Sequence, residues 1–185
     1  MKGDVAGFVK VCDSCQRRKL ALPELPDLQE PVRHAGPFRH VHIDLAGPFP
    51  TPLVSVQGRI RQPRPKEEVP KAYVVLIICY FTKAAEFVVV HEKSAATVAA
   101  AFFNGWVCRF GVPEHLTSDN GGEFAGAFAH MLQRLGVHHI TTSPKPPAAN
   151  GAVERLVRSF KDIIVKAVNS HPVHWVRMVP HMHMA

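Results

Sequence analysis

Apolar and polar residues alternate along several short stretches of the chain, which is the pattern of half-buried strands. In residues 39–46, Val41 and Ile43 alternate with His42 and Asp44. Runs of β-branched residues bounded by turn residues also indicate strands. We therefore expect five strands, over residues 39–46, 73–79, 84–90, 114–118 and 137–141. The first is expected to end at the Gly-Pro-Phe-Pro run of residues 47–50.

Three longer stretches predict helices. Residues 151–169 carry apolar side chains at the i, i+3, i+4 spacing of an amphipathic helix. The alanine-rich stretch 94–110 starts at a potential N-cap, Ser94, and the stretch 123–135 stops before Gly136. Neighbouring strands followed by alternating helix and strand indicate an α/β fold, with a mixed five-stranded sheet flanked by helices.

Proline-rich stretches separate these elements. Prolines punctuate residues 20–37, which read as an extended linker, so we expect the main domain to cover residues 38–185. Residues 51–71 and 143–149 are predicted to be loops. With 185 residues and 46% hydrophobic composition, the chain can form one domain with a sizeable core.

The charge balance points to a partner. Lys and Arg number 22 against 15 Asp and Glu, a formal net charge of +7, and such a surface attracts nucleic acid. The longest apolar run, residues 74–79, is too short to cross a bilayer, and the first residues show no signal-peptide pattern. We therefore expect nucleic acid rather than a membrane as partner, and a nuclear or cytoplasmic setting.

Three acidic residues stand at positions suited to chemistry. Asp44 lies within a predicted strand among apolar neighbours, Asp119 follows a strand, and Glu154 lies in the first turn of a helix. Strand ends and helix N-termini are where α/β proteins build their sites. Three converging carboxylates would repel one another unless a divalent cation such as Mg²⁺ (or Mn²⁺) neutralised them. Two such ions could activate a nucleophile and stabilise the leaving oxygen of a phosphodiester.

Each acid also has a purely structural interpretation. Asp119 could cap the turn and helix that follow it. Glu154 is favourable at a helix start simply through the helix dipole. Asp44 could form a buried ion pair with an arginine. Spacing alone therefore leaves both interpretations open.

Five segments, in order, resemble motifs of retroviral and gypsy-type retrotransposon integrases. Three of them carry the acids: residues 42–48 (HIDLAGP), 116–124 (LTSDNGGEF) and 150–155 (NGAVER). Residues 80–83 (YFTK) and 110–113 (FGVP) are similar to two further landmarks of that family.

The resemblance implies an RNase H-like fold and a polynucleotidyl transferase. Such an enzyme processes the 3′ ends of its element's DNA and then transfers the strands to a target. Asp44, Asp119 and Glu154 would be both the catalytic residues and the metal ligands, and a homodimer or higher oligomer is implied. The resemblance and the helix spacing together predict nucleic-acid contacts from Asn150, Arg155, Arg158 and Lys161. Arg158 and Lys161 fall one and two turns after Glu154 on one helix face, which could also be merely a solvated face.

The chain departs from the family pattern in places. The spacing between Asp119 and Glu154 is one residue shorter than usual, residues 145–148 replace the usual mobile-loop motif, and the 51–71 insert is longer. A decayed or domesticated core that binds nucleic acid or protein without catalysis is therefore an alternative. A ribonuclease H-like nuclease is another.

The cysteines suggest a partial module. Cys12 and Cys15 resemble the second half of the family's His-His-Cys-Cys zinc module, but no histidine precedes them. A structural zinc site needs four ligands, so we expect this one to be incomplete and residues 1–37 to be a remnant of the module plus a linker. Cys79 and Cys108 are expected to be buried thiols.

Overall fold

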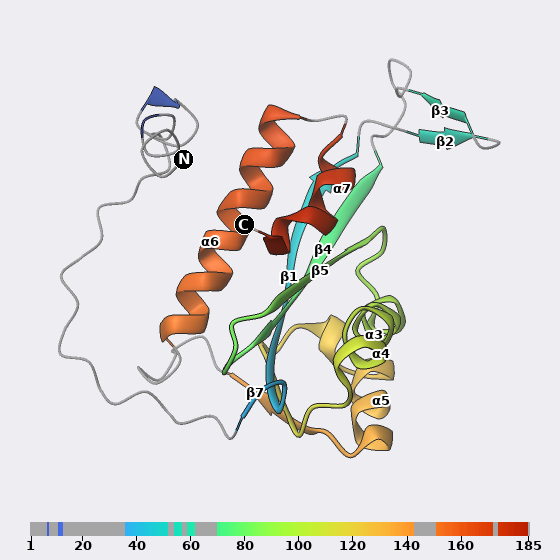
Figure 1. Ribbon diagram of the computed structural model, residues 1–185. Helices are drawn as coiled ribbons and strands as arrows, with labels where there is room; N and C mark the ends of the chain where they lie inside the picture. The colour runs from blue at the N-terminus through green and yellow to red at the C-terminus, as the bar shows by residue number, and fades with distance from the viewer. Residues whose placement is uncertain are drawn as a thin grey trace.

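A mixed five-stranded sheet with helices on both faces forms the centre of the molecule (Figure 1). The computed structural model describes residues 7, 11–12, 36–51, 54–56, 59–61, 70–142, 151–171 and 174–184. The strand order is β5-β4-β1-β6-β7. The strands are β1 (His40–Pro50), β4 (Lys71–Cys79), β5 (Ala85–Val90), β6 (His115–Ser118) and β7 (His138–Thr141). β1 pairs antiparallel with β4 and parallel with β6, which confirms the predicted fold class.

Strand β1 is longer than predicted. It continues through the Gly-Pro-Phe-Pro run because Phe49 and Pro50 still pair with β4 after a register shift. At that irregularity Gly47 has φ 129°, and a Cβ there would lie 3.0 Å from the Tyr73 ring. The close approach of the two strands therefore requires glycine. The prediction that β1 ends at residue 47 is wrong.

The predicted loop 51–71 also contains regular structure. β2 (Val54–Val56) and β3 (Arg59–Arg61) pair antiparallel as a separate two-stranded sheet. Residues 52–53, 57–58 and 62–69 lie outside the described residues. The loop prediction is therefore wrong for the two short strands.

The helix predicted over residues 94–110 is confirmed, with a change of winding in its second half. It comprises α3 (Ala95–Phe102), the π-helical η1 (Phe103–Val107) and α4 (Cys108–Phe110). Ser94 Oγ accepts a hydrogen bond from the Thr97 amide at 3.2 Å, as an N-cap does.

The helix predicted over residues 123–135 is confirmed only in its second half. A 3₁₀ turn, η2 (Gly122–Phe124), precedes α5 (Ala127–Leu135), and the two are separated at Gly126, whose φ is 51°. A left-handed residue interrupts the helical hydrogen bonds, and glycine adopts it without strain. α5 ends at Gly136 in the left-handed region, as predicted.

The C-terminal part packs on the opposite side of the sheet from α3 to α5 (Figure 1). It contains α6 (Gly151–Ser170), which matches the predicted helix, and α7 (Trp175–Met178) with η4 (Val179–Met184), which the pattern did not predict. Among the described residues, no helix is long and apolar enough to span a membrane.

Each face of the sheet has its own core. Val41, Ile43 and Leu116 pack with α3, η1 and α5, whereas Leu76 and Phe87 pack with α6 and α7. Because alternate strand residues point to opposite faces, the residues between Val41, Ile43 and Leu45 face the α6 side. This places His42 and Asp44 beneath α6.

The thiol predictions are half correct. Cys79 is buried in the α3 core and accepts hydrogen bonds from the amides of Phe38 and Thr82. Cys108 is exposed, so its prediction as a buried thiol is wrong. The apolar neighbours of Cys108 in sequence lie on other faces of the helical turn.

Candidate active site

The three acids of the sequence motifs line one open pocket of about 820 Å³. Asp44 comes from the middle of β1, Asp119 from the end of β6 and Glu154 from the first turn of α6. β1 and β6 are parallel neighbours in which His42 pairs with Thr117. Asp44 and Asp119 each follow two residues later, so they lie side by side. The N-terminus of α6 then closes the pocket from above the sheet.

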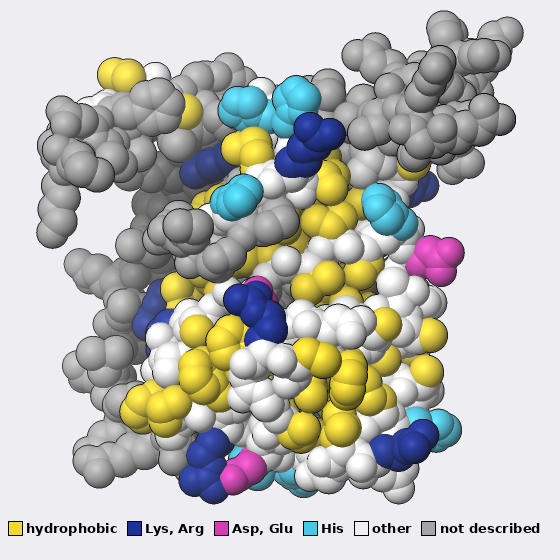
Figure 2. All heavy atoms as spheres, turned by 45° about the vertical axis from the view of Figure 1, so that its right-hand side comes forward, with side chains coloured by type: hydrophobic (Ala, Val, Ile, Leu, Met, Phe, Trp, Pro, Cys, Tyr) yellow, Lys and Arg dark blue, Asp and Glu magenta, His cyan; other side chains and the backbone are white. Residues whose placement is uncertain are grey.

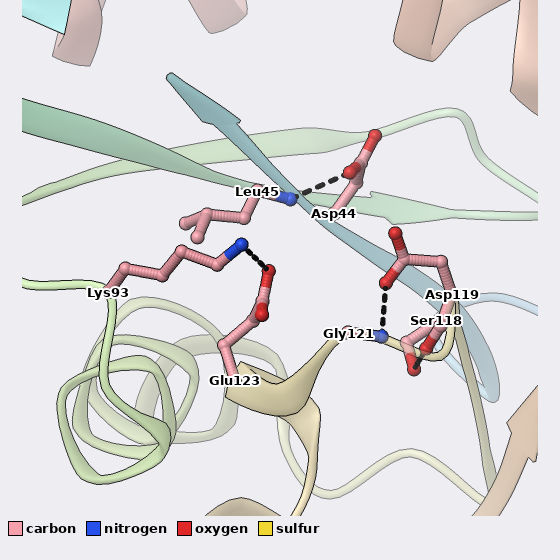
Figure 3. Close-up of polar contacts among 7 residues, drawn as sticks. All are labelled: Asp44, Leu45, Lys93, Ser118, Asp119, Gly121 and Glu123. Atoms are coloured by element: carbon pink, nitrogen blue, oxygen red, sulfur yellow. Dashed lines mark hydrogen bonds and ion pairs between the residues drawn. The ribbon is translucent and has the colours of Figure 1, made fainter. Parts of the chain in front are cut away.

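Asp44 is partly enclosed, with its side chain 15% exposed. Its Oδ1 accepts the Leu45 amide at 2.7 Å (Figure 3), and its Oδ2 pairs with Lys161 Nζ at 2.6 Å. The predicted structural alternative, an ion pair, therefore exists, but its partner is a lysine of α6 rather than an arginine.

Asp119 organises the turn after β6. Its Oδ1 accepts the Gly121 amide at 3.0 Å (Figure 3), so the turn interpretation of this residue is confirmed alongside its place in the pocket. The helix-capping interpretation is wrong, because the N-caps of η2 and α5 are Gly121 and Gly126 and neither helix start has a side-chain cap hydrogen bond. Ser118 donates its hydroxyl to the Asp119 carbonyl at 2.7 Å, and its Oγ lies 2.8 Å from His139 Nε2. Since the single Ser118 proton is used, Nε2–H of His139 is the donor to Ser118.

The same turn contains a buried acid that the sequence analysis overlooked. Glu123 is 7% exposed and pairs with Lys93 at 3.2 Å (Figure 3). A Cβ on Gly121 would lie 2.8 Å from the Glu123 carboxylate, so a larger residue at that position would displace this carboxylate. The pair ties the Asp119 turn to the segment before α3. The sequence feature that could have identified Glu123 is its place directly after Asp-Asn-Gly-Gly and before Phe124.

Helix α6 presents both signs of charge to the pocket. Arg158, Lys161 and Asp162 line it together with Glu154. These positions share a helix face, as the spacing predicted. Asp162 was not predicted, although it lies two turns after Glu154.

Of the other two predicted nucleic-acid contacts, only Arg155 is among the described residues. Arg155 is exposed and does not line the pocket. Asn150 and the loop 143–150 lie outside the described residues, so those predictions remain predictions.

His42 lines the pocket, and Tyr80 lies beside His42. Burial lowers the pKa of His42, with Lys161 acting in the same direction and Asp44 opposing it. Burial also raises the pKa of Tyr80 to about 12. Both groups are therefore neutral at pH 7, and the Tyr80 hydroxyl lies 3.5 Å from His42 Nδ1. His42 could have been found from the sequence, because it precedes Asp44 by two residues on the same strand face.

The donor set suits a hard divalent cation. Carboxylate oxygens are the ligands that Mg²⁺ prefers, and three elements bring such oxygens to one pocket. The Asp44 carboxylate already stabilises one positive charge, the ammonium of Lys161. In the side-chain positions of the described residues, no three His, Cys, Asp or Glu groups are close enough to share one ion. Binding would therefore involve a change of side-chain rotamers.

Only part of the predicted zinc module is among the described residues. Cys12 is described, and Cys15 lies outside the described residues. The incompleteness of that site stays a prediction.

The acid-side stability of the fold is expected to depend on His139. Its pKa is lowered from 6.5, first by burial and then by the neighbouring His138. The unfolded chain thus binds a proton more readily than the folded chain, and stability is lost as pH falls below 6.5. Thermal unfolding followed by circular dichroism at pH 7.5 and 5.5 should show a smaller drop in midpoint for His139→Gln than for wild type. Equal drops would mean that other histidines carry the effect.

The strand order and the helices on both faces of the sheet define an RNase H-like fold, with an acid-lined pocket between β1, β6 and α6. Residues 34–147, more than half of the chain, match the family model described as integrase core domain. The chain therefore belongs to the integrase core domain family, whose process is DNA integration.

Curated relatives are retroelement polyproteins or resemble them. The chain is 29% identical to an uncharacterised protein of Caenorhabditis elegans (K02A2.6), over 90% of this chain and 11% of that protein. It is 25% identical to the Pro-Pol polyprotein of Simian foamy virus type 3 (strain LK3), over 100% of this chain and 15% of the polyprotein. The chain thus spans a small fraction of the relatives it matches.

Solved structures agree on the fold. The HTLV-2 integrase catalytic core domain in complex with magnesium, in its trimeric form, superposes with a TM-score of 0.55 at 16% identity. That match covers 82% of this chain and 86% of the HTLV-2 chain. The dimeric form of the same domain gives a TM-score of 0.52 over 80% and 86% of the two chains.

Proposed function

We propose that this chain is the catalytic core of a retroelement integrase. It would process the 3′ ends of the element's DNA and join the new 3′-hydroxyls to target DNA, with divalent metal ions. The observation that carries the proposal is the single pocket lined by Asp44, Asp119 and Glu154, with two cationic side chains of α6 on the same pocket.

Each group in the pocket has a proposed role. Asp44, Asp119 and Glu154 would hold Mg²⁺ or Mn²⁺, which when bound activates the attacking oxygen and stabilises the leaving one. Arg158 and Lys161 would hold phosphates and set the register of the DNA. Neutral His42 lines the pocket without adding charge beside the metal ligands, and the neutral Tyr80 hydroxyl lies 3.5 Å from its Nδ1. Asn150 and Arg155 remain proposed DNA contacts by family resemblance.

DNA is the proposed macromolecular partner. The net charge of +7 supports it, and binding through phosphates should weaken steeply as salt concentration rises. The same proposal includes the division of the chain into an N-terminal segment (1–37) and a core (38–185). It also includes a nuclear or cytoplasmic setting.

A homodimer or higher oligomer is proposed as well. Figure 2, viewed toward the side of α3 to α5, shows hydrophobic side chains at the surface. Phe103 and Val112, at the ends of η1 and α4, are 41% and 47% exposed. The dimeric and trimeric forms of the HTLV-2 core support assembly.

The test is the reversal of strand transfer on a branched DNA substrate with Mg²⁺ or Mn²⁺. Wild type should resolve the branch, and Glu154→Gln should not, because the amide is a poor ligand for a hard divalent cation. Glu92→Gln makes the same chemical change at an exposed residue outside the pocket and should match wild type. If a folded, DNA-binding wild type leaves the branch intact, the chain is a binding protein descended from an integrase.

A further inference from the structure

The ion pair between Lys161 and Asp44 joins a proposed DNA contact to a proposed metal ligand. Lys161 Nζ lies 2.6 Å from Asp44 Oδ2, and the other Asp44 oxygen accepts the Leu45 amide. Both oxygens of this carboxylate are thus engaged. A magnesium ion would have to sit about 2.0–2.1 Å from one of them.

An ammonium and a divalent cation cannot share Oδ2 at these distances. Like charges that close repel strongly in a half-buried pocket, where solvent screens them poorly. Lys161 has a flexible four-carbon stem, and its side chain is 41% exposed, so the ammonium can swing toward solvent. Arg158 lines the same pocket three residues earlier on α6 and offers a second cation for comparison.

We propose that Lys161 is a resident counter-ion that links metal binding to DNA binding. This inference rests on the proposed function. In the metal-free protein Lys161 neutralises Asp44. A divalent cation displaces the ammonium from Asp44, and the released ammonium is then available to a DNA phosphate. By linkage, metal must strengthen DNA binding and DNA must strengthen metal binding by the same factor.

The first arm of the test measures Mn²⁺ binding to the full chain without DNA, by the electron paramagnetic resonance signal of free Mn²⁺. Lys161→Gln should bind Mn²⁺ on the order of 5-fold more tightly than wild type, because no ion pair opposes the metal. Lys161→Arg keeps the charge and should bind no more tightly than wild type. Arg158→Gln removes an equal charge without this ion pair and should change the affinity by less than about 2-fold.

The second arm measures DNA affinity by fluorescence anisotropy with and without Ca²⁺, which fills oxygen sites while avoiding turnover. Metal should strengthen DNA binding more in wild type than in Lys161→Gln. If Lys161→Gln and Arg158→Gln change Mn²⁺ affinity equally, only the pocket's overall charge matters and the counter-ion role is wrong. If wild type and all variants bind no Mn²⁺, the proposed metal site and this inference both fall. If Glu154→Gln weakens Mn²⁺ binding while Lys161→Gln leaves it unchanged, only this inference falls.

Discussion

Asp44→Asn is expected to lower the rate of strand-transfer reversal by more than about 100-fold. Even the loss of a residue that only hydrogen-bonds a metal ligand typically lowers metal affinity or activity by about 10- to 100-fold, and Asp44 is a proposed ligand itself. The substitution keeps the size and shape of the side chain and removes its charge. The Lys161 pair is partly exposed, so its loss should change the free energy of unfolding by about 1 kcal/mol at most. Single-turnover assays and urea denaturation of the same preparation measure both quantities.

Asp162→Asn provides the matched comparison for Asp44→Asn. Asp162 lines the pocket but lies outside the three acid motifs, so its loss should cost less than about 10-fold. If both variants lose activity equally, Asp44 has no special place in the chemistry. If Asp44→Asn unfolds the protein, its role is structural.

Trp175→Ala is expected to lower the free energy of unfolding by about 3–5 kcal/mol, as large-to-small changes at buried tryptophans do. The Trp175 side chain is fully buried in the core beneath α6. Its Nε1 donates to the Pro50 carbonyl at 3.0 Å, and its ring meets Phe49 edge-on at 5.6 Å. It thereby anchors α7 to the end of β1. Urea denaturation followed by circular dichroism measures the loss.

Met178→Ala tests whether this effect belongs to the buried ring. Met178 lies on the same short helix but is 37% exposed, so its loss should cost less than about 0.5 kcal/mol. A loss for Trp175→Ala as small as that expected for Met178→Ala would show that α7 contributes little packing energy in solution.

Much of the site was accessible from local patterns. The alternation in β1 placed His42 and Asp44 on one face, opposite the core residues Val41 and Ile43. The i, i+3, i+4 pattern predicted α6 to within one residue of its C-terminal end and set Glu154 in its first turn. These features depend on neighbours within a turn or a few strand positions, so the sequence is sufficient to specify them.

Irregularities of the backbone were harder to foresee. The glycine and prolines at residues 47–50 predicted a strand end, but pairing with β4 carries β1 onward. The hairpin of β2 and β3 was hidden in a proline-rich insert. In both cases hydrogen bonds to a partner strand outweigh a weak local preference.

The amino-acid order alone predicted the fold class, the helix that carries Glu154 and the three acids that the structure brings to one pocket. The folded chain decided which polar groups of distant segments meet. Lys161 pairs with Asp44, Glu123 with Lys93, and Trp175 with Pro50, and in each case the partners come from different elements. Such contacts depend on how α6, α7 and the loop before α3 dock on the sheet. Docking is set by the packing of whole faces, which no local pattern of residues specifies.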